Sequence, residues 1–370
     1  MIDENNQELI TSDKGKIFVI NNLPPPSAIY RYSHDLTDAL SGKSKLVNII
    51  YDKSKWLTNP DGHCYTGKFG NHYIINATLN NFSFKSLRIL LLNHIKAGGF
   101  VHYAHESSRP FKLPNSKCVA TIHENPEIRL NTDLYSNQKN GFAENLNKGF
   151  RKKLYNEYKR FENILTVSES VKKGLIDFGF SGKIKVVYPP VSHEFKPLQN
   201  KIALRKKLNL PLNKKLILSV STNTKRKNLQ MVREVMQYIG NDFQLVRIGE
   251  SIGNDYFFNN VDGKTLNEIY NACDLLLFPT LAEGYGYPLV EALSVGLPVV
   301  ASNIEVIRET AGNAAILVDH DSKDNFIKGI NEALSASDEL IKLGYERSDR
   351  YSFTNFKKNI VQYYGNLGVK

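Results

Sequence analysis

The sequence has few cysteines, no long apolar run and no leader-like start, and each absence narrows the class of protein. Three cysteines occur (Cys64, Cys118 and Cys273), an odd number without paired spacing, which argues against a disulfide framework and a zinc site and fits a reducing compartment. The most apolar short run, residues 89–92, is far too short to cross a bilayer. The start, MIDENNQELITSDKGK, is polar and acidic, so we expect no signal peptide and a cytoplasmic protein.

Charge is not evenly distributed along the chain. Of the net charge of +11, residues 1–190 carry +9, from 26 Lys and Arg against 17 Asp and Glu, and the remainder carries +2. A basic half suits nucleic acid, an anionic membrane or phosphorylated ligands. We find no zinc-finger spacing and no RNP-like aromatic string, so we expect no nucleic-acid partner. The basic run 148–160 leaves two readings open: a peripheral site on the inner face of a membrane, or a solvated surface.

Composition and length predict two globular α/β domains. Apolar residues make up 41% of the chain, which is enough for packed cores. Short apolar runs alternate with helical patterns along the chain, which is the pattern of an α/β protein. Residues 53–82 and 125–145 show neither pattern and are expected to be irregular. A proline-rich stretch after residue 188 indicates a linker, so we place domain boundaries at 1–188 and 198–350.

The run 278–302, FPTLAEGYGYPLVEALSVGLPVVAS, indicates a strand, a loop, a helix and a second strand. Two glutamates, together with the glycines and prolines that mark the loop and the helix boundaries, define this run: Glu283, Gly284, Gly286, Pro288, Glu291, Gly296 and Pro298. Glycines let backbone N–H groups approach a ligand closely, and proline is favoured in the first turn of a helix. A helix start offers unpaired donors and a positive dipole end, so the loop predicts an anion site, with phosphate the usual occupant.

This run resembles the signature of glycosyltransferase family 4, which has the GT-B architecture of two Rossmann-like domains with parallel sheets facing a central cleft. The resemblance implies that Glu283 contacts the donor sugar and that Glu291 takes the ribose hydroxyls. It also implies that the backbone of Gly284, Tyr285, Gly286 and Tyr287 holds the diphosphate. The alternative is an ordinary α/β crossover with two solvated acids.

Further residues match the same family at other points of the chain. His123, at the end of an expected strand 117–124, matches a histidine that hydrogen-bonds near the transferred sugar. Arg226 and Lys227, in a loop entering a helix, match a basic pair that contacts the diphosphate, and Gly249 ends a strand beside the nucleoside. His102 and His105 are expected to be ordinary core residues or, as the alternative, to line the cleft. The last helix, within 351–370, is expected to cross back onto the first domain.

The sequence also departs from the family pattern. Pro24, Pro25 and Pro26 occupy the first loop, where many relatives carry a glycine pair, and Ser221 with Thr222 stand where many carry an arginine. The short run 319–321 contains two aspartates and a histidine, but no other candidate ligand is near it in sequence, so we predict no metal site.

The resemblance therefore implies a retaining, metal-independent glycosyltransferase without a cofactor. We expect it to move a sugar from a nucleoside diphosphate sugar to a sugar or lipid-linked acceptor, with Glu283 and His123 at the reacting centre. Two alternatives remain open at this point. One is a GT-B sugar-nucleotide epimerase or phosphorylase, and the other is a non-catalytic subunit that binds sugar nucleotides.

Overall fold

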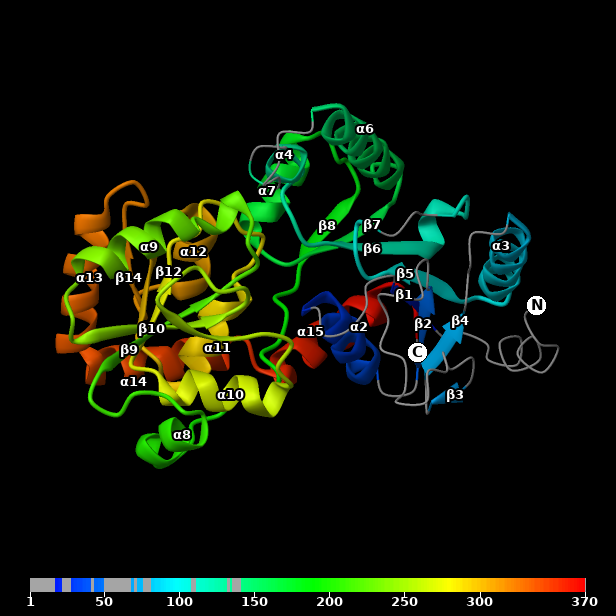
Figure 1. Ribbon diagram of the computed structural model, residues 1–370. Helices are drawn as coiled ribbons and strands as arrows, with labels where there is room; N and C mark the ends of the chain where they lie inside the picture. Colours follow the sequence, from blue (N-terminus) through cyan, green and yellow to red (C-terminus); the bar gives the residue numbers. More distant parts are fainter. Residues whose placement is uncertain are drawn as a thin grey trace.

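A computed structural model describes residues 17–21, 28–40, 43–49, 68–69, 72–75, 81–107, 111–131, 134 and 141–369. It contains two β-sheets with helices on both faces of each, arranged as two bodies (Figure 1). The predicted α/β class and GT-B-like architecture are confirmed. We call the body built on the first sheet the N-terminal half and the body built on the second sheet the C-terminal half.

The sheet of the N-terminal half has the strand order β3-β4-β2-β1-β5-β6-β7-β8. Neighbouring strands of this sheet pair in parallel, except β3 with β4, which pair antiparallel. The strands are β1 (Ile17–Asn21), β2 (Ser44–Ile49), β3 (Lys68–Phe69), β4 (His72–Ile75), β5 (Phe100–Tyr103), β6 (Cys118–Ile122), β7 (Asn163–Thr166) and β8 (Lys183–Val186). The helices are α2 (Ala28–Ala39), α3 (Asn81–Lys96), α4 (Pro126–Leu130), α6 (Gly141–Tyr158) and α7 (Glu169–Asp177), with a 3₁₀ turn η2 (Asn115–Lys117).

Two segments that we expected to be irregular contain regular structure. Strand β4 pairs in parallel with β2, so a four-residue run becomes a strand because a neighbouring edge is available to it. Helix α4 begins where the side chain of Asn125 accepts a hydrogen bond from the N–H of Glu127, with Pro126 in the first turn. The helix is five residues long and is too short to produce a detectable period in the sequence.

The sheet of the C-terminal half has the order β11-β10-β9-β12-β13-β14, and its neighbouring strands all pair in parallel. Its strands are β9 (Lys215–Val220), β10 (Phe243–Ile248), β11 (Asp255–Phe258), β12 (Leu275–Phe278), β13 (Val299–Ser302) and β14 (Ile316–Val318). Its helices are α8 (Lys201–Lys207), α9 (Leu229–Tyr238), α10 (Gly263–Ala272), α11 (Tyr287–Val295), α12 (Glu305–Ala311), α13 (Lys323–Ser335) and α14 (Ser337–Asp349), with a 3₁₀ turn η3 (Lys225–Lys227). Residues 187–200 join the halves without helix or strand.

The last helix, α15 (Phe353–Asn366), lies beside α2 on the sheet of the N-terminal half (Figure 1). Its Phe356, Ile360 and Tyr364 belong to the apolar cluster that covers one face of that sheet. The hydroxyl of Tyr364 also lies 2.6 Å from Nδ1 of the buried His102. The end of the chain therefore forms part of the core of the half in which the chain begins.

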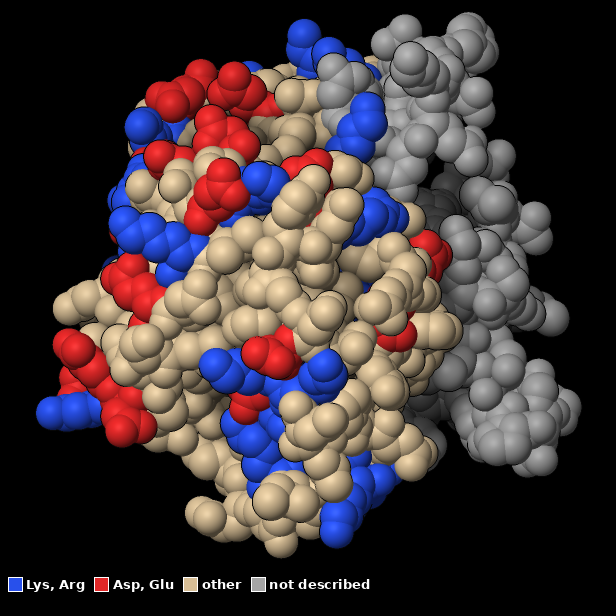
Figure 2. Space-filling view, turned by 60° about the vertical axis from the view of Figure 1, so that its left-hand side comes forward, with Lys and Arg blue, Asp and Glu red and all other residues tan. Residues whose placement is uncertain are grey.

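The surface of the C-terminal half carries charges of both signs. On the face shown in Figure 2, blue and red side chains are interspersed, and the largest blue group surrounds red atoms. This mixing agrees with the net charge of +2 that the sequence gives to residues 191–370. Such a face has no extended field of one sign that would attract a large polyanion.

Candidate active site

A cavity of about 630 Å³ lies between the two halves, at the carboxyl ends of their strands. Doubly wound sheets bind ligands at this edge, and the volume is in the range of small-molecule sites. We call it the cleft cavity. The ten residues that the sequence predicted for the site all line it: His123, Arg226, Lys227, Gly249, Glu283, Gly284, Tyr285, Gly286, Tyr287 and Glu291. Arg31 and Glu124, which the sequence did not predict, line it as well.

The loop between β12 and α11 forms one wall of the cleft cavity. Gly286 has a φ of +96°, a left-handed conformation that favours glycine, and α11 begins directly after it with Pro288 in its first turn. Gly284 is needed for a different reason: a Cβ there would lie 1.7 Å from the carbonyl oxygen of His123. The absent side chain lets the loop reach the end of β6 in the opposite half.

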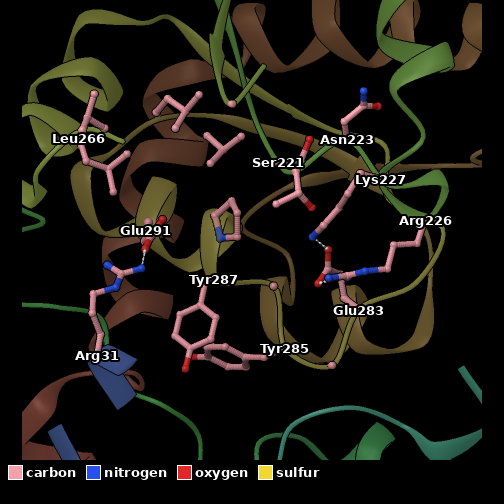
Figure 3. A pocket seen from close by; sticks show the side chains of 18 of the residues that line it. Arg31, Ser221, Asn223, Arg226, Lys227, Leu266, Glu283, Tyr285, Tyr287 and Glu291 are labelled. Carbon is pink, nitrogen blue, oxygen red and sulfur yellow. Dashed lines mark hydrogen bonds and ion pairs between the residues drawn. The ribbon is translucent and has the colours of Figure 1, made fainter. Parts of the chain in front are cut away.

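Glu283 lies in a cluster of charges at one end of this loop (Figure 3). One carboxylate oxygen pairs with Lys227 and lies 3.1 Å from the hydroxyl of Thr280, and the other accepts a hydrogen bond of 3.1 Å from Arg226. Burial alone would raise the pKa of Glu283, but the charges of Lys227 and then Arg226 hold that pKa below its usual value. Glu283 is therefore ionised at neutral pH, with two cations in contact.

The two cations lie in the segment that enters α9, before that helix begins. They belong to the 3₁₀ turn η3, and α9 begins only after Asn228, whose φ of +52° ends the turn. The turn aims both side chains at the cleft cavity and keeps positive charge out of the first turn of α9, where it would be unfavourable. Arg226 also lies 3.7 Å from Glu124 of the N-terminal half.

Glu291 lies on α11, about one turn beyond the loop, and is almost fully buried, with its side chain 5% exposed. Its Oε1 accepts a hydrogen bond of 2.9 Å from Nη2 of Arg31, and its Oε2 accepts one of 2.8 Å from the hydroxyl of Tyr270. Arg31 comes from α2 of the N-terminal half, so the contact crosses the cleft (Figure 3). The helical pattern of residues 30–40 did not indicate that this side chain faces the cleft.

His123 follows β6 and is neutral. Its Nε2 lies 2.8 Å from the carbonyl oxygen of Ala104, and since a carbonyl only accepts, Nε2 carries the proton and Nδ1 is left as an acceptor. Burial, assisted by His105, lowers the pKa of His123 to about 4. The ring can therefore accept a hydrogen bond from a ligand hydroxyl but does not bring a positive charge to the site.

His102 and His105 do not line the cleft cavity and prove to be core residues. His102 lies within hydrogen-bond distance of both Tyr364 and Thr121, at 2.6 and 2.7 Å. Nδ1 of His105 lies 2.6 Å from the hydroxyl of Ser107. Burial lowers the pKa of each ring to about 3, as expected for neutral histidines that are satisfied inside a core.

Gly249 ends β10 under tight constraint. Its φ is +128°, and a Cβ would lie 2.3 Å from the carbonyl oxygen of Ser221. Below it lies Arg247, which is fully buried and donates to Ser219, Ser221 and the carbonyl of Glu250. These hydrogen bonds fix the ends of β9 and β10, which form the wall of the cleft cavity away from Arg31. Nothing in the sequence pattern indicated that Arg247 is buried.

Within the described residues, no three His, Cys, Asp or Glu side chains gather as they would around a metal ion. The run 319–321 is exposed on the surface after β14. The described cysteines, Cys118 and Cys273, are buried and free. Across the same part of the chain, no helix combines the length and apolar character needed to cross a bilayer.

Two family models match the chain in succession. Residues 76–195 match the model described as Glycosyltransferase Family 4, and residues 200–350 match the model described as Glycosyl transferases group 1. The second match contains the cluster around Glu283 and the whole loop 279–286. The chain belongs to glycosyltransferase family 4.

Curated relatives of this family-4 chain agree with that assignment. An uncharacterised glycosyltransferase of Methanocaldococcus jannaschii is 26% identical over 232 residues, which span 54% of this chain and 59% of the relative. The O-antigen chain mannosyltransferase RfbU of Salmonella typhimurium is 26% identical over 265 residues, 67% of this chain and 73% of the relative. The alignment thus spans less than two thirds of the archaeal protein.

Solved structures share the fold at low identity. Sucrose-phosphate synthase from Thermosynechococcus elongatus superposes with a TM-score of 0.72 at 16% identity, covering 96% of this chain and 99% of that one. Anabaena HepE, solved in complex with UDP-glucose, gives a TM-score of 0.71 at 13% identity, covering 95% and 99%. These similarities establish the two-sheet fold.

Proposed function

We propose that this family-4 chain transfers a hexose from a nucleoside diphosphate sugar to an acceptor hydroxyl, with retention of configuration at the sugar. The observation that carries the proposal is the pairing of Glu283 with Lys227 and Arg226 beside the start of α11. In one cavity, this arrangement offers an ionised carboxylate for sugar hydroxyls and two cations with a helix start for a diphosphate.

Each residue of the site then has a role in holding the donor. Glu283 accepts hydrogen bonds from sugar hydroxyls and so orients the ring. The diphosphate lies against the backbone amides of residues 284–287, with Arg226 and Lys227 on its other side. Glu291 accepts from the ribose hydroxyls, Gly249 leaves room for the nucleoside, and Nδ1 of His123 accepts from a hydroxyl of the transferred sugar.

The chemical step needs no covalent nucleophile from the protein. The acceptor oxygen forms a bond to the anomeric carbon on the face from which the diphosphate leaves, and the departing phosphate oxygen takes the proton of the acceptor hydroxyl. Arg226, Lys227 and the start of α11 stabilise the charge that develops on the leaving diphosphate. In this proposal the protein's own cations supply that charge stabilisation, so the reaction does not depend on a metal ion.

The relatives suggest the class of sugar and of acceptor. RfbU and a second relative, O-antigen chain mannosyltransferase B of Escherichia coli, are mannosyltransferases by name, and HepE binds UDP-glucose in its structure. We therefore extend the proposal to a hexosyltransferase of glycan biosynthesis whose acceptor is a sugar or a lipid-linked sugar. The exposed lysines of α6 fit an enzyme that works peripherally at an anionic membrane on the cytoplasmic side.

Two rival functions make different predictions. A sugar-nucleotide epimerase or a phosphorylase of the same architecture would turn over its sugar substrate without an acceptor hydroxyl. A non-catalytic subunit would bind the donor but leave it unchanged. The intact charge cluster around Glu283 favours catalysis over the second rival.

The test begins by measuring the melting temperature with UDP, GDP and ADP and then with their hexose conjugates, because a ligand that binds the folded state raises it. The best donor is then assayed for transfer with the wild type and with Glu283→Gln. Gln keeps the shape but not the charge, so we expect transfer to fall by at least ~100-fold. Binding of the nucleoside diphosphate should stay within several-fold, because both cations remain. Near-normal transfer by Glu283→Gln would contradict the role of Glu283.

A further inference from the structure

Arg31 connects the two halves through Glu291, the residue to which we assign binding of the ribose. Its Nη2 donates to Oε1 of Glu291 over 2.9 Å, and the two residues are 260 positions apart in the chain. The guanidinium is held from a second side as well, 6.0 Å from the centre of the Phe195 ring in the segment that links the halves. The side chain of Arg31 is 31% exposed and lines the cleft cavity, so it is within reach of a ligand there.

The contact fixes the orientation of Glu291 without using up its capacity to bind. Each carboxylate oxygen can accept about two hydrogen bonds. Arg31 takes one on Oε1 and the hydroxyl of Tyr270 takes one on Oε2, which leaves capacity on both oxygens for a pair of vicinal hydroxyls. With Tyr270 buried in the C-terminal half and Arg31 anchored in the N-terminal half, the carboxylate is held from both sides of the cleft.

The cost of burying the Glu291 carboxylate gives Arg31 and Tyr270 different roles in holding it. A carboxylate that is 5% exposed is costly to leave without a cation, and a tyrosine hydroxyl offers only a neutral donor. If the two halves moved apart, Arg31 would leave with α2, and Glu291 would lose both its charge partner and its second anchor. Its orientation toward a ribose is therefore best defined only when the halves are closed.

We propose that Arg31 is a positioning residue for the donor, which holds Glu291 in its ribose-binding orientation from the opposite half and so couples recognition of the ribose to closure of the cleft. The inference rests on the proposed function, in which Glu291 binds the ribose. Linkage makes the coupling reciprocal: a ribose on Glu291 strengthens the contact with Arg31, and that contact draws the acceptor side toward the donor.

The experiment compares a ribonucleotide with its analogue that lacks both ribose hydroxyls. The probes are the nucleoside diphosphate that binds the wild type best, chosen from UDP, GDP and ADP, and its 2′,3′-dideoxy form. Dissociation constants are measured by calorimetry for the wild type, Arg31→Ala and Arg31→Lys. The matched control is Lys173→Ala, which removes a different ion pair between the halves, 3.7 Å from Lys173 to Glu305, outside the cleft cavity.

We expect the wild type to prefer the ribonucleotide by about tenfold or more, since hydrogen bonds to a charged group are worth that much. Arg31→Ala should weaken binding of the ribonucleotide by a similar factor and leave the affinity for the dideoxy form within about twofold of the wild type. The preference for the ribonucleotide should therefore disappear. Arg31→Lys should keep only part of the preference, because an ammonium does not reproduce the planar guanidinium. Lys173→Ala should keep all of it.

The outcomes separate the two proposals. If Arg31→Ala or Arg31→Lys binds both probes more weakly by the same factor, the preference is unchanged and Arg31 is only a structural bridge, which overturns the inference. If the wild type binds none of the three diphosphates, the proposed function fails and the inference fails with it. Calorimetric unfolding of each variant checks that a loss of preference does not come from a loss of fold.

Discussion

At the scale of single residues, the charge cluster explains how the protein keeps two cations ready for a diphosphate. In this structure Lys227 and Arg226 are both in contact with Glu283, which offsets the cost of burying three charges. Burial lowers the pKa of Lys227, and the charge of Glu283 acts against that change. Both cations are therefore already in place before a diphosphate enters the cleft cavity. The diphosphate would share them with Glu283.

We predict that Lys227→Ala weakens binding of the donor more than Arg226→Ala does, because Arg226 divides its charge between Glu283 and Glu124. A charge-assisted contact is worth about 1.5–3 kcal/mol, so we expect a loss of roughly 10- to 100-fold in affinity, measured by calorimetry. Lys225→Ala is the matched control, since this exposed lysine of the same turn does not line the cleft cavity.

The transfer assay tests whether the reaction depends on a metal. With the wild type, EDTA should leave transfer unchanged. Loss of transfer in EDTA, restored by Mg²⁺ or Mn²⁺, would contradict our account of how the diphosphate charge is stabilised.

Asp35, one turn after Arg31 on α2, carries a carboxyl whose pKa is raised to about 7, chiefly by burial and further by Asp38, against the charge of Arg31. An unfolded chain ionises this group near its ordinary pKa of 3.8. Below that pH the group is protonated in both states and has no effect. Stability falls as the pH rises from about 4 to 7, and the full cost of the buried charge is present above pH 7.

We therefore predict that Asp35→Asn raises the melting temperature at pH 8 by about 2 °C or more and changes it little at pH 4. Scanning calorimetry at the two pH values measures the difference. Asp242, whose carboxylate is exposed, provides a control variant, Asp242→Asn. Its changes in melting temperature at pH 4 and at pH 8 should be small and similar. A larger gain for Asp35→Asn at pH 4 than at pH 8 would contradict the assignment.

At the scale of elements, the loop before α11 works because its glycines bring backbone close to backbone. Gly284 lies against the carbonyl of His123, and its own carbonyl accepts a hydrogen bond of 2.7 Å from the hydroxyl of Ser168 at the start of α7. The loop is thus in direct contact with two elements of the N-terminal half. A side chain at residue 284 would meet main-chain atoms that cannot rotate away.

We predict that Gly284→Ala lowers kcat/KM for transfer by at least ~100-fold, because the halves must separate or the loop must shift from the reacting sugar. Overpacking should also cost about 1–3 kcal/mol of stability, measured by denaturant unfolding. Gly149→Ala in α6 is the control, because no atom lies within 4 Å of the added methyl and alanine favours a helix. Activity of Gly284→Ala within twofold of the wild type would show that the close approach does not matter for catalysis.

At the scale of the whole molecule, contacts outside the cleft cavity also hold the halves together. The carboxylate of Glu309 on α12 accepts from the backbone N–H groups of Glu169 and Ser170, at 2.7 and 3.0 Å, and so caps α7 of the other half. It also accepts from the hydroxyl of Tyr188 in the linking segment, at 2.8 Å. Together with α15, these contacts tie the two halves to each other outside the cleft cavity.

Helix α6 presents several of the basic side chains of the N-terminal half on its surface. On α6, Lys148, Lys152 and Lys153 are exposed beside Phe150, whose side chain is 54% exposed, whereas Leu154 and its apolar neighbours face the core. Arg151 is partly buried and donates to the carbonyl of Arg129, so it serves the fold as much as the surface. Each exposed lysine near an anionic bilayer contributes about 1 kcal/mol.

We predict that the protein sediments with vesicles that contain anionic lipid and not with purely zwitterionic vesicles or at ~0.5 M salt. Changing Lys148, Lys152 and Lys153 together to Ser should weaken binding roughly 100-fold, by the sum of their contributions. The matched control changes three exposed lysines of the C-terminal half to Ser: Lys206, Lys328 and Lys342. If wild-type protein does not sediment with anionic vesicles at low salt, that result would contradict the membrane proposal and favour a soluble acceptor.

The sequence by itself determined those features of the fold that depend on residues close together in the chain. Apolar runs, prolines and glycines placed the strand, loop and helix of residues 275–302, because each of these signals acts within a turn or two of the chain. The position of His123 after β6 followed from strand ends lying along one edge of a parallel sheet. The family pattern added the expected roles of Glu283 and Glu291.

Only the tertiary structure decided which side chains meet. The contact between Arg31 and Glu291 joins residues 260 positions apart, and the buried cluster of Arg247 joins the ends of two strands. Burial makes His102, His105 and His123 neutral. None of this leaves a periodic trace in the sequence, because partners across a cleft and depth below a surface follow from how the two halves pack, not from spacing along the chain.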